Sequence, residues 1–285
     1  MNKILLPFLI LIVTANTFAQ KDSTQFVTTW RTTNFGQGGD STIVIPVDTN
    51  YTYNFDVDWN NDGVFDDLGV NDTISHTYPD TGTYTIRIKG LFPRYYKFGP
   101  IFPNNKLIAL EQWGTNPWLN MERMFWYNDS FTYNAVDTPN LTHITSLDYL
   151  FYLNRNFNGD LSNWDVSRIK SMQWIFTSCH NFNQPMANWD VSNVISMVGI
   201  FSGCSNFNQP LNNWMVDSCK VFSAMFAYSN FNQTINNWNV GNAEDFTNMF
   251  QNCPFNQSIN NWDVSRVKNT RFMFKDNIAF NQPLD

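Results

Sequence analysis

From about Phe157 to the end of the chain, hydrophobic residues return with a period of 24 or 25 positions. A Trp marks each copy, with a Phe seven residues before it and a Val two residues after it. The marker residues are Trp164, Trp189, Trp214, Trp238 and Trp262, preceded by Phe157, Phe182, Phe207, Phe231 and Phe255. A period in the twenties is typical of a solenoid, in which neighbouring copies supply the core to one another.

Within each copy the pattern predicts one short helix and one short strand. In the second copy the apolar residues Val194, Met197, Ile200, Phe201 and Cys204 follow helical spacing. The residue after the Val, such as Ser192, is of a type that caps the start of a helix. The preceding segment, residues 182–189, is rich in Asn and Pro and is expected to be extended. We therefore predict an α/β repeat solenoid over residues 157–285, with five copies and the start of a sixth.

Residues 23–92 carry a different pattern, in which apolar and polar residues alternate. Strands are predicted over residues 42–45, 51–59 and 83–88, which are rich in β-branched and aromatic residues. Turn residues at 61–63 and 80–82 separate them. Several short strands at this spacing favour a small all-β, immunoglobulin-like sandwich ahead of the repeats.

The first residues have the three parts of an export signal: Lys3, the apolar run 4–13 and the small-residue site Thr17-Phe18-Ala19. We expect residues 1–19 to be a signal peptide, and the protein to be secreted or displayed on the cell surface. The alternative is a short membrane anchor, but the run is below the roughly 20 residues that span a bilayer. No later run reaches that length, so no transmembrane segment is expected in the mature chain.

Composition narrows the function classes. Hydrophobic residues make up 43% of the chain, enough for a core, and the net charge is −7 with no run of Lys and Arg, which argues against a nucleic-acid partner. The three His residues are not accompanied by a recognisable nucleophile motif, and no phosphate-binding loop is present. We therefore expect neither catalytic nor cofactor-binding residues and predict a binding protein, not an enzyme.

One loop has the chemistry of a metal site. Asp58, Asn60 and Asp62 alternate before Gly63, and Asp67 follows, as in the first half of a calcium-binding loop. Gly69 stands where such a loop has its bidentate Glu. Asp58, Asn60, Asp62 and Asp67 are thus candidate ligands of a structural calcium ion, and the alternative is a polar turn.

Other residues recur in rows, each with a structural and a functional interpretation. Asp165, Asp190 and Asp263 could bind a cation or act as acid and base, but Met215 and Asn239 interrupt the row and favour capping. The Asn residues after each Phe are expected to bond backbone groups between copies, with glycan recognition as the alternative. The Trp residues are expected in the core, unless some face outward and stack on sugars. Cys179 and Cys204 lie at equivalent positions and could approach disulfide range, although buried free thiols are favoured.

Two resemblances extend this interpretation. The pattern Met-x-x-Ile-Phe-x-x-Cys-x-x-Phe-Asn-Gln-Pro-(Leu/Met)-x-Asn-Trp-Asp-Val-Ser resembles the BspA-type leucine-rich-repeat surface proteins of bacteria, and residues 93–156 look like degenerate opening copies or a cap. Val57-Asp58-Trp59, with residues 75–78 and 82–86, resembles a polycystic-kidney-disease (PKD) type domain. These resemblances imply a surface protein used in adhesion or recognition, with a PKD-like module over residues 23–92.

The function predicted from the sequence is the capture of an extracellular protein or glycan on the solenoid face. The alternatives are a structural envelope or matrix component that self-associates, and an accessory module of a secreted hydrolase system. Because the chain stops within a sixth copy, we also expect either an incomplete chain or an end covered by a partner or a second copy.

Overall fold

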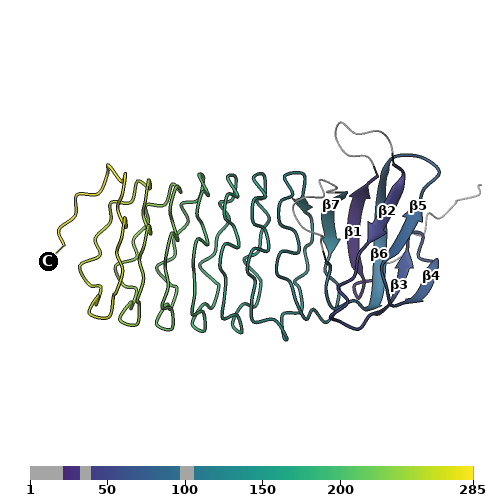
Figure 1. Ribbon diagram of the computed structural model, residues 1–285, viewed down its shortest axis with the longest axis horizontal. Coiled ribbons are helices and arrows are strands. Elements are labelled where there is room, and N and C mark those ends of the chain that lie inside the picture. The colour runs from purple at the N-terminus through teal and green to yellow at the C-terminus, as the bar shows by residue number, and fades with distance from the viewer. Residues whose placement is uncertain (1–21, 33–39, 97–105, 285) are drawn as a thin grey trace, which may run out of the picture.

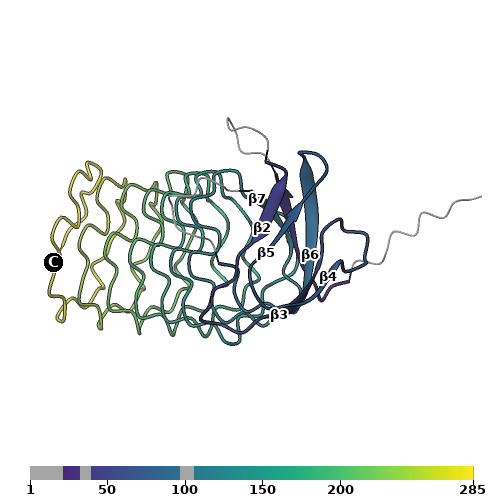
Figure 2. The ribbon, with the colours of Figure 1, turned by 45° about the vertical axis from the view of Figure 1, so that its right-hand side comes forward.

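The computed structural model describes residues 22–32, 40–96 and 106–284. A β-stranded part occupies one end of an elongated molecule, and the rest of the chain winds into a row of stacked coils (Figures 1 and 2). The predicted signal peptide lies outside the described residues. Among those described, no helix is long and apolar enough to cross a membrane.

The β-stranded part contains a six-stranded mixed sheet and a two-stranded sheet. The larger sheet has the order β4-β3-β6-β1-β7-β8 and the smaller pairs β2 with β5. The strands are β1 Phe26–Arg31, β2 Thr42–Ile45, β3 Asn54–Asp58, β4 Asp67–Val70, β5 Ile74–Thr77, β6 Thr83–Leu91, β7 Leu107–Gln112 and β8 Thr132–Tyr133. The three strands expected from the sequence are therefore present, as β2, β3 and β6.

The β-stranded part continues into the coils. β7 pairs antiparallel with β1, and β8 pairs parallel with β7 through Ala109–Thr132 and Leu110–Tyr133. The predicted layout, an all-β sandwich formed by residues 23–92, is wrong for this reason: two strands from later in the chain complete the sheet. The junction fixes the first coil against the sheet.

The predicted α/β solenoid is wrong, because the described residues contain no helix. Each coil is made of tight turns. The segment predicted as extended, residues 182–189, contains no strand, and the parallel bridges between coils, such as Ser171–Ser196, lie in the segment predicted as helix. Two residues in each coil have a left-handed backbone, for example Trp174 (φ 58°) and Ser178 (φ 59°). A left-handed residue interrupts a right-handed helix.

Peptide groups in these turns point the same way along the stack. In one coil every second N–H group donates to the next coil, from Met172, Trp174, Phe176 and Ser178 to the carbonyls of Ser196, Val198, Ile200 and Ser202 at 2.7–3.2 Å. Of the N–H groups between them, that of Thr177 closes a turn onto the Trp174 carbonyl, and that of Gln173 donates to the Asp148 side chain of the preceding coil at 2.7 Å. Because a trans peptide holds C=O opposite N–H, the matching carbonyls face the preceding coil. The result is a set of hydrogen-bond columns parallel to the stack.

The core is a set of aromatic columns inside the coils. Ring centroids of Phe157, Phe182 and Phe207 lie 5.9 Å apart from copy to copy, and a second column passes through Phe176 and Phe201. The two columns contact each other within each coil, as between Phe201 and Phe207 at 3.8 Å. These rings are buried, so the coils supply the core to one another as the repeat period predicted.

Candidate functional site

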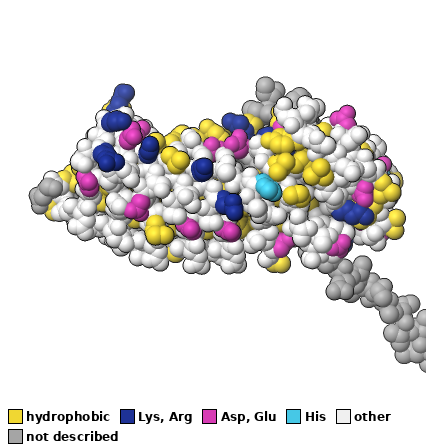
Figure 3. All heavy atoms as spheres, turned by 90° about the horizontal axis from the view of Figure 1, so that it is seen from below, with side chains coloured by type: hydrophobic (Ala, Val, Ile, Leu, Met, Phe, Trp, Pro, Cys, Tyr) yellow, Lys and Arg dark blue, Asp and Glu magenta, His cyan; other side chains and the backbone are white. Residues whose placement is uncertain are grey.

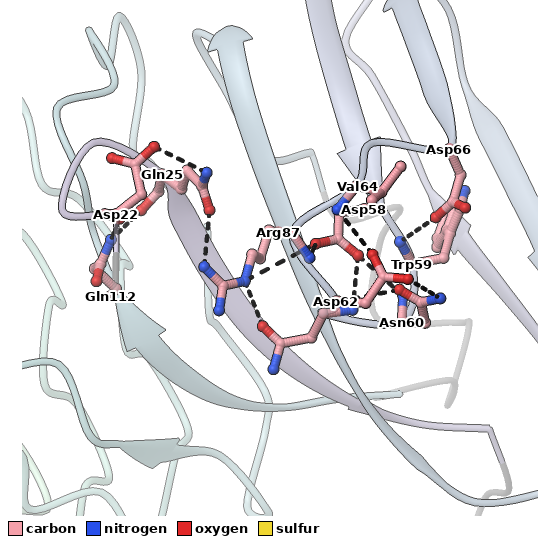
Figure 4. Close-up of polar contacts among 12 residues, drawn as sticks. Asp22, Gln25, Asp58, Trp59, Asn60, Asp62, Val64, Asp66, Arg87 and Gln112 are labelled. Carbon is pink, nitrogen blue, oxygen red and sulfur yellow. Dashed lines mark hydrogen bonds and ion pairs between the residues drawn. The ribbon is translucent and has the colours of Figure 1, made fainter. Parts of the chain in front are cut away.

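The predicted calcium loop connects β3 to β4, and its first acidic residue is fully buried (Figure 4). Asp58 Oδ1 accepts the N–H groups of Asn60 (3.3 Å) and Asn61 (2.7 Å), and Oδ2 accepts that of Gly63 (2.9 Å). Arg87 Nε lies 4.0 Å from Oδ2. The Asp58 carboxylate therefore holds the turn together and faces a cation from β6.

The other candidate ligands also have hydrogen bonds within the loop. Asp62 accepts the Val64 N–H at 2.8 Å and the Asn60 side-chain amide at 3.0 Å, while Asp67 accepts the Trp59 indole N–H at 2.7 Å. Within the described residues, no group of three or more His, Cys, Asp or Glu side chains is placed to hold a metal ion. These bonds support the polar-turn alternative, and calcium at this loop stays a prediction.

The recurring polar residues have structural roles. Asp165, Asp190 and Asp263 each accept the N–H of the Ser two residues later, at 3.0–3.1 Å, so they cap a turn where a helix had been predicted. The Asn ladder is confirmed: Asn183 Oδ1 accepts the N–H of Asn208 (3.1 Å), whose own Oδ1 accepts that of Asn232 (2.9 Å).

The recurring Trp and Cys residues belong to the core. Trp189, Trp214, Trp238 and Trp262 are buried, and each indole N–H donates to a carbonyl of the preceding copy at 2.8–3.1 Å. All four Cys are free and buried. Burial raises the pKa of the Cys179 thiol well above its usual value, and its Sγ donates to the Phe151 carbonyl at 3.1 Å.

A different set of positions forms the face that varies from copy to copy. We call it the variable face, and it consists of the two left-handed positions of each coil. The first position holds Arg123, Tyr149, Trp174, Gly199, Ala224, Asn248 and Phe272; the second holds Tyr127, Leu153, Ser178, Gly203, Tyr228, Asn252 and Asp276. Neighbouring core positions keep the same residue types, whereas these range from Gly to Trp. The fold therefore fixes the backbone here and leaves the side chain open.

The variable face is aromatic at its N-terminal end. Trp174 lies over the next coil, where a Cβ atom added to Gly199 would be 2.1 Å from its ring. Tyr149 contacts Tyr152 edge to face, and the Arg123 guanidinium lies 4.7 Å from the Tyr149 ring. In the space-filling view from below, acidic and basic side chains are interspersed along the stack, while hydrophobic ones gather towards the β-stranded end (Figure 3).

The sequence pattern did not single out these aromatic residues. Most lie in residues 93–156, where the repeat is degenerate, and they stand next to the marker residues instead of being among them. The signal that could have found them is the variation itself, since an alignment of the copies places Tyr149 and Trp174 opposite Gly199 and Ala224.

The fold and these positions define a repeat protein with an invariant aromatic core and a variable lateral face. The chain belongs to the family described as "Mycoplasma protein of unknown function, DUF285", whose model matches residues 119–230 and 213–285, together more than half of the chain. No curated protein and no solved structure matches the chain.

Proposed function

We propose that this is an exported surface protein that acts in adhesion or recognition by binding an extracellular protein or glycan on its variable face. The observation that carries the proposal is that residue types are constant at the core positions of the coils and vary at the left-handed positions. Core residues repeat from copy to copy, whereas the left-handed positions carry Tyr, Trp, Gly, Ala, Asn and Phe on one backbone. Extended faces of this kind are the binding surfaces of stacked-repeat proteins.

The sequence supports the same proposal from two directions. The N-terminal residues 1–19 have the pattern of an export signal, and the repeat motif resembles BspA-type surface proteins of bacteria. Aromatic and Arg side chains, the residue types at the N-terminal end of the face, are those enriched in binding hot spots.

The test is a glycan and matrix-protein array probed with the protein, with and without calcium. We expect selective binding that the double variant Trp174→Ala/Tyr228→Ala weakens by about tenfold, the equivalent of roughly 1.4 kcal/mol. The matched control is Asn163→Ala/Asn188→Ala, which changes exposed residues on a different segment of the coils. No binding to any ligand, combined with self-association in light scattering, would favour a structural matrix component instead.

A further inference from the structure

A cleft of about 490 Å³ lies where the β-stranded part meets the first coils. Arg94 and Tyr96 line it from the segment after β6, Arg123 and Trp126 from the first coil, and Tyr149 and Tyr152 from the second. Its volume falls in the range of about 300–1,000 Å³ that is usual for small-ligand sites. Four aromatic rings in one cleft give a ligand apolar surface to contact.

The geometry of the rings selects the shape of that ligand. The Tyr149 and Tyr152 rings meet edge to face, at 5.4 Å and 76°, so these neighbours do not form a parallel slot for a flat base. The apolar C–H face of a puckered sugar ring suits such surfaces, because the face of an aromatic ring is electron-rich. The aromatic geometry therefore favours a saccharide over a nucleobase.

The two Arg residues are already stacked on rings, with Arg123 4.7 Å from Tyr149 and Arg94 5.2 Å from Tyr96. Stacking occupies the flat face of a guanidinium and leaves N–H groups at its edge. Arg94 Nη1 is held by Asp48 at 3.0 Å, whereas its Nε is buried and has no hydrogen-bond partner among the described residues. The Arg123 side chain is exposed, so the N–H groups at the edge of its guanidinium are the donors open to a ligand.

Acceptors lie beside these donors. Glu122 lines the same cleft. The N–H group of Arg123 donates to the Asp148 carbonyl of the second coil, so the carbonyl of Glu122 points away from that coil. A sugar hydroxyl is both donor and acceptor, and this wall offers both kinds of partner.

The charges in the cleft offset one another. Asp48 neutralises Arg94, and the Glu122 carboxylate balances the charge of Arg123, so nothing favours an acidic ligand over a neutral one. We propose that the cleft binds one unit of a neutral saccharide. This inference rests on the proposed recognition function and names the ligand class for its N-terminal site.

The experiment measures binding of maltotriose, cellotriose, chitotriose, mannotriose and lactose to the full chain by saturation-transfer NMR and calorimetry, with sialyllactose and trigalacturonate as acidic probes. We expect at least one neutral probe to bind with an affinity that changes little with salt, because screening acts on charge pairs. Tyr149→Ala and Arg123→Gln should each weaken it by about tenfold or more. Met215→Ala, which changes an exposed apolar side chain of a later coil outside the variable face, should leave it unchanged.

Both variants retain a Cβ atom at their left-handed positions, and a thermal melt confirms that each folds. Salt-sensitive binding of only the acidic probes, or binding unaffected by Tyr149→Ala, would overturn the inference. If the array finds protein ligands but no probe binds, the saccharide site fails and the recognition function stands. If nothing binds in either experiment, both fail.

Discussion

At the scale of single residues, burial determines the chemical state of the cysteines. Export would permit disulfides, yet the four cysteines are free and buried, and two of their thiols donate to carbonyls of the preceding coil, at 3.1 Å from Cys179 and 2.9 Å from Cys204. Burial raises the pKa of Cys219 to about 12 and that of Cys253 to about 11. The folded state therefore favours the neutral thiol.

A prediction follows for alkaline pH. The folded state holds the thiol proton more tightly than the unfolded state, in which a cysteine has a pKa of about 8.5. The raised pKa therefore contributes its full stability below about pH 8.5, and this contribution is lost as the pH rises through about 11 to 12. We expect all four thiols of the folded protein to resist a disulfide reagent at pH 8 and to react in urea. Urea midpoints should fall progressively above about pH 9. Rapid labelling of any thiol in the folded protein would contradict this.

At the scale of the element, the sequence identified which side chains are buried but not the backbone that buries them. Val194, Met197, Ile200 and Phe201 are all fully buried, as their helical spacing predicted. Successive four-residue turns, such as Met197 to Ile200, also bring side chains inward every three or four residues, so a chain of turns and a helix produce the same pattern of buried positions.

The backbone could not be predicted because its key residues are atypical. Bulky residues such as Tyr149 and Trp174 rarely adopt positive φ, and here their N–H groups donate hydrogen bonds to the next coil. The candidate calcium loop was visible as a local motif. The aromatic cleft was not, because it joins Arg94 to Trp126 and Tyr149 across segments that the fold alone brings together.

Gly199 tests the packing of neighbouring coils. Its φ is +59°, and a Cβ atom would overlap the Trp174 ring, whereas a Cβ at Gly203 (φ +70°) would come no closer than 3.2 Å to the Ser178 hydroxyl. We expect Gly203→Ala to cost about 1 kcal/mol from its backbone conformation alone. Gly199→Ala should cost a further 1–3 kcal/mol, roughly, from overpacking.

The measurement is urea unfolding in a double-mutant cycle with Trp174→Ala. Removing the ring should abolish the additional cost of Gly199→Ala, because Ala224 occupies the equivalent position of the next coil at φ 53°. Additive effects of the two substitutions would mean that the ring does not determine the choice of Gly.

At the scale of the whole molecule, the aligned peptide groups make each coil dependent on its neighbours. Hydrogen bonds, the Asn ladder, the indole N–H bonds and the Phe columns all connect one copy to the next at 22–28 residues' separation. In the described part of the chain, no coil contains a helix that could persist alone. Stability should then be a sum over interfaces between adjacent copies, as in other stacked repeats.

Deleting one whole copy tests this view. Removing residues 207–230 joins Asn206 to Phe231, and the full-length chain has an Asn-Phe pair at each of the two cut points. In the shortened chain, Asn183 Oδ1 can accept the Asn232 N–H in place of the Asn208 N–H. We expect the variant to fold with an unchanged circular dichroism signature per residue. Its urea unfolding should have a smaller slope, because less surface is exposed.

Deleting residues 207–218 is the control, since it removes half a copy and leaves the Trp and Phe columns out of register. That shorter deletion should abolish cooperative unfolding although it removes fewer residues. If the two variants unfold alike, the copies are not interchangeable units, and stability would instead depend on the contact between the β-stranded part and the first coils.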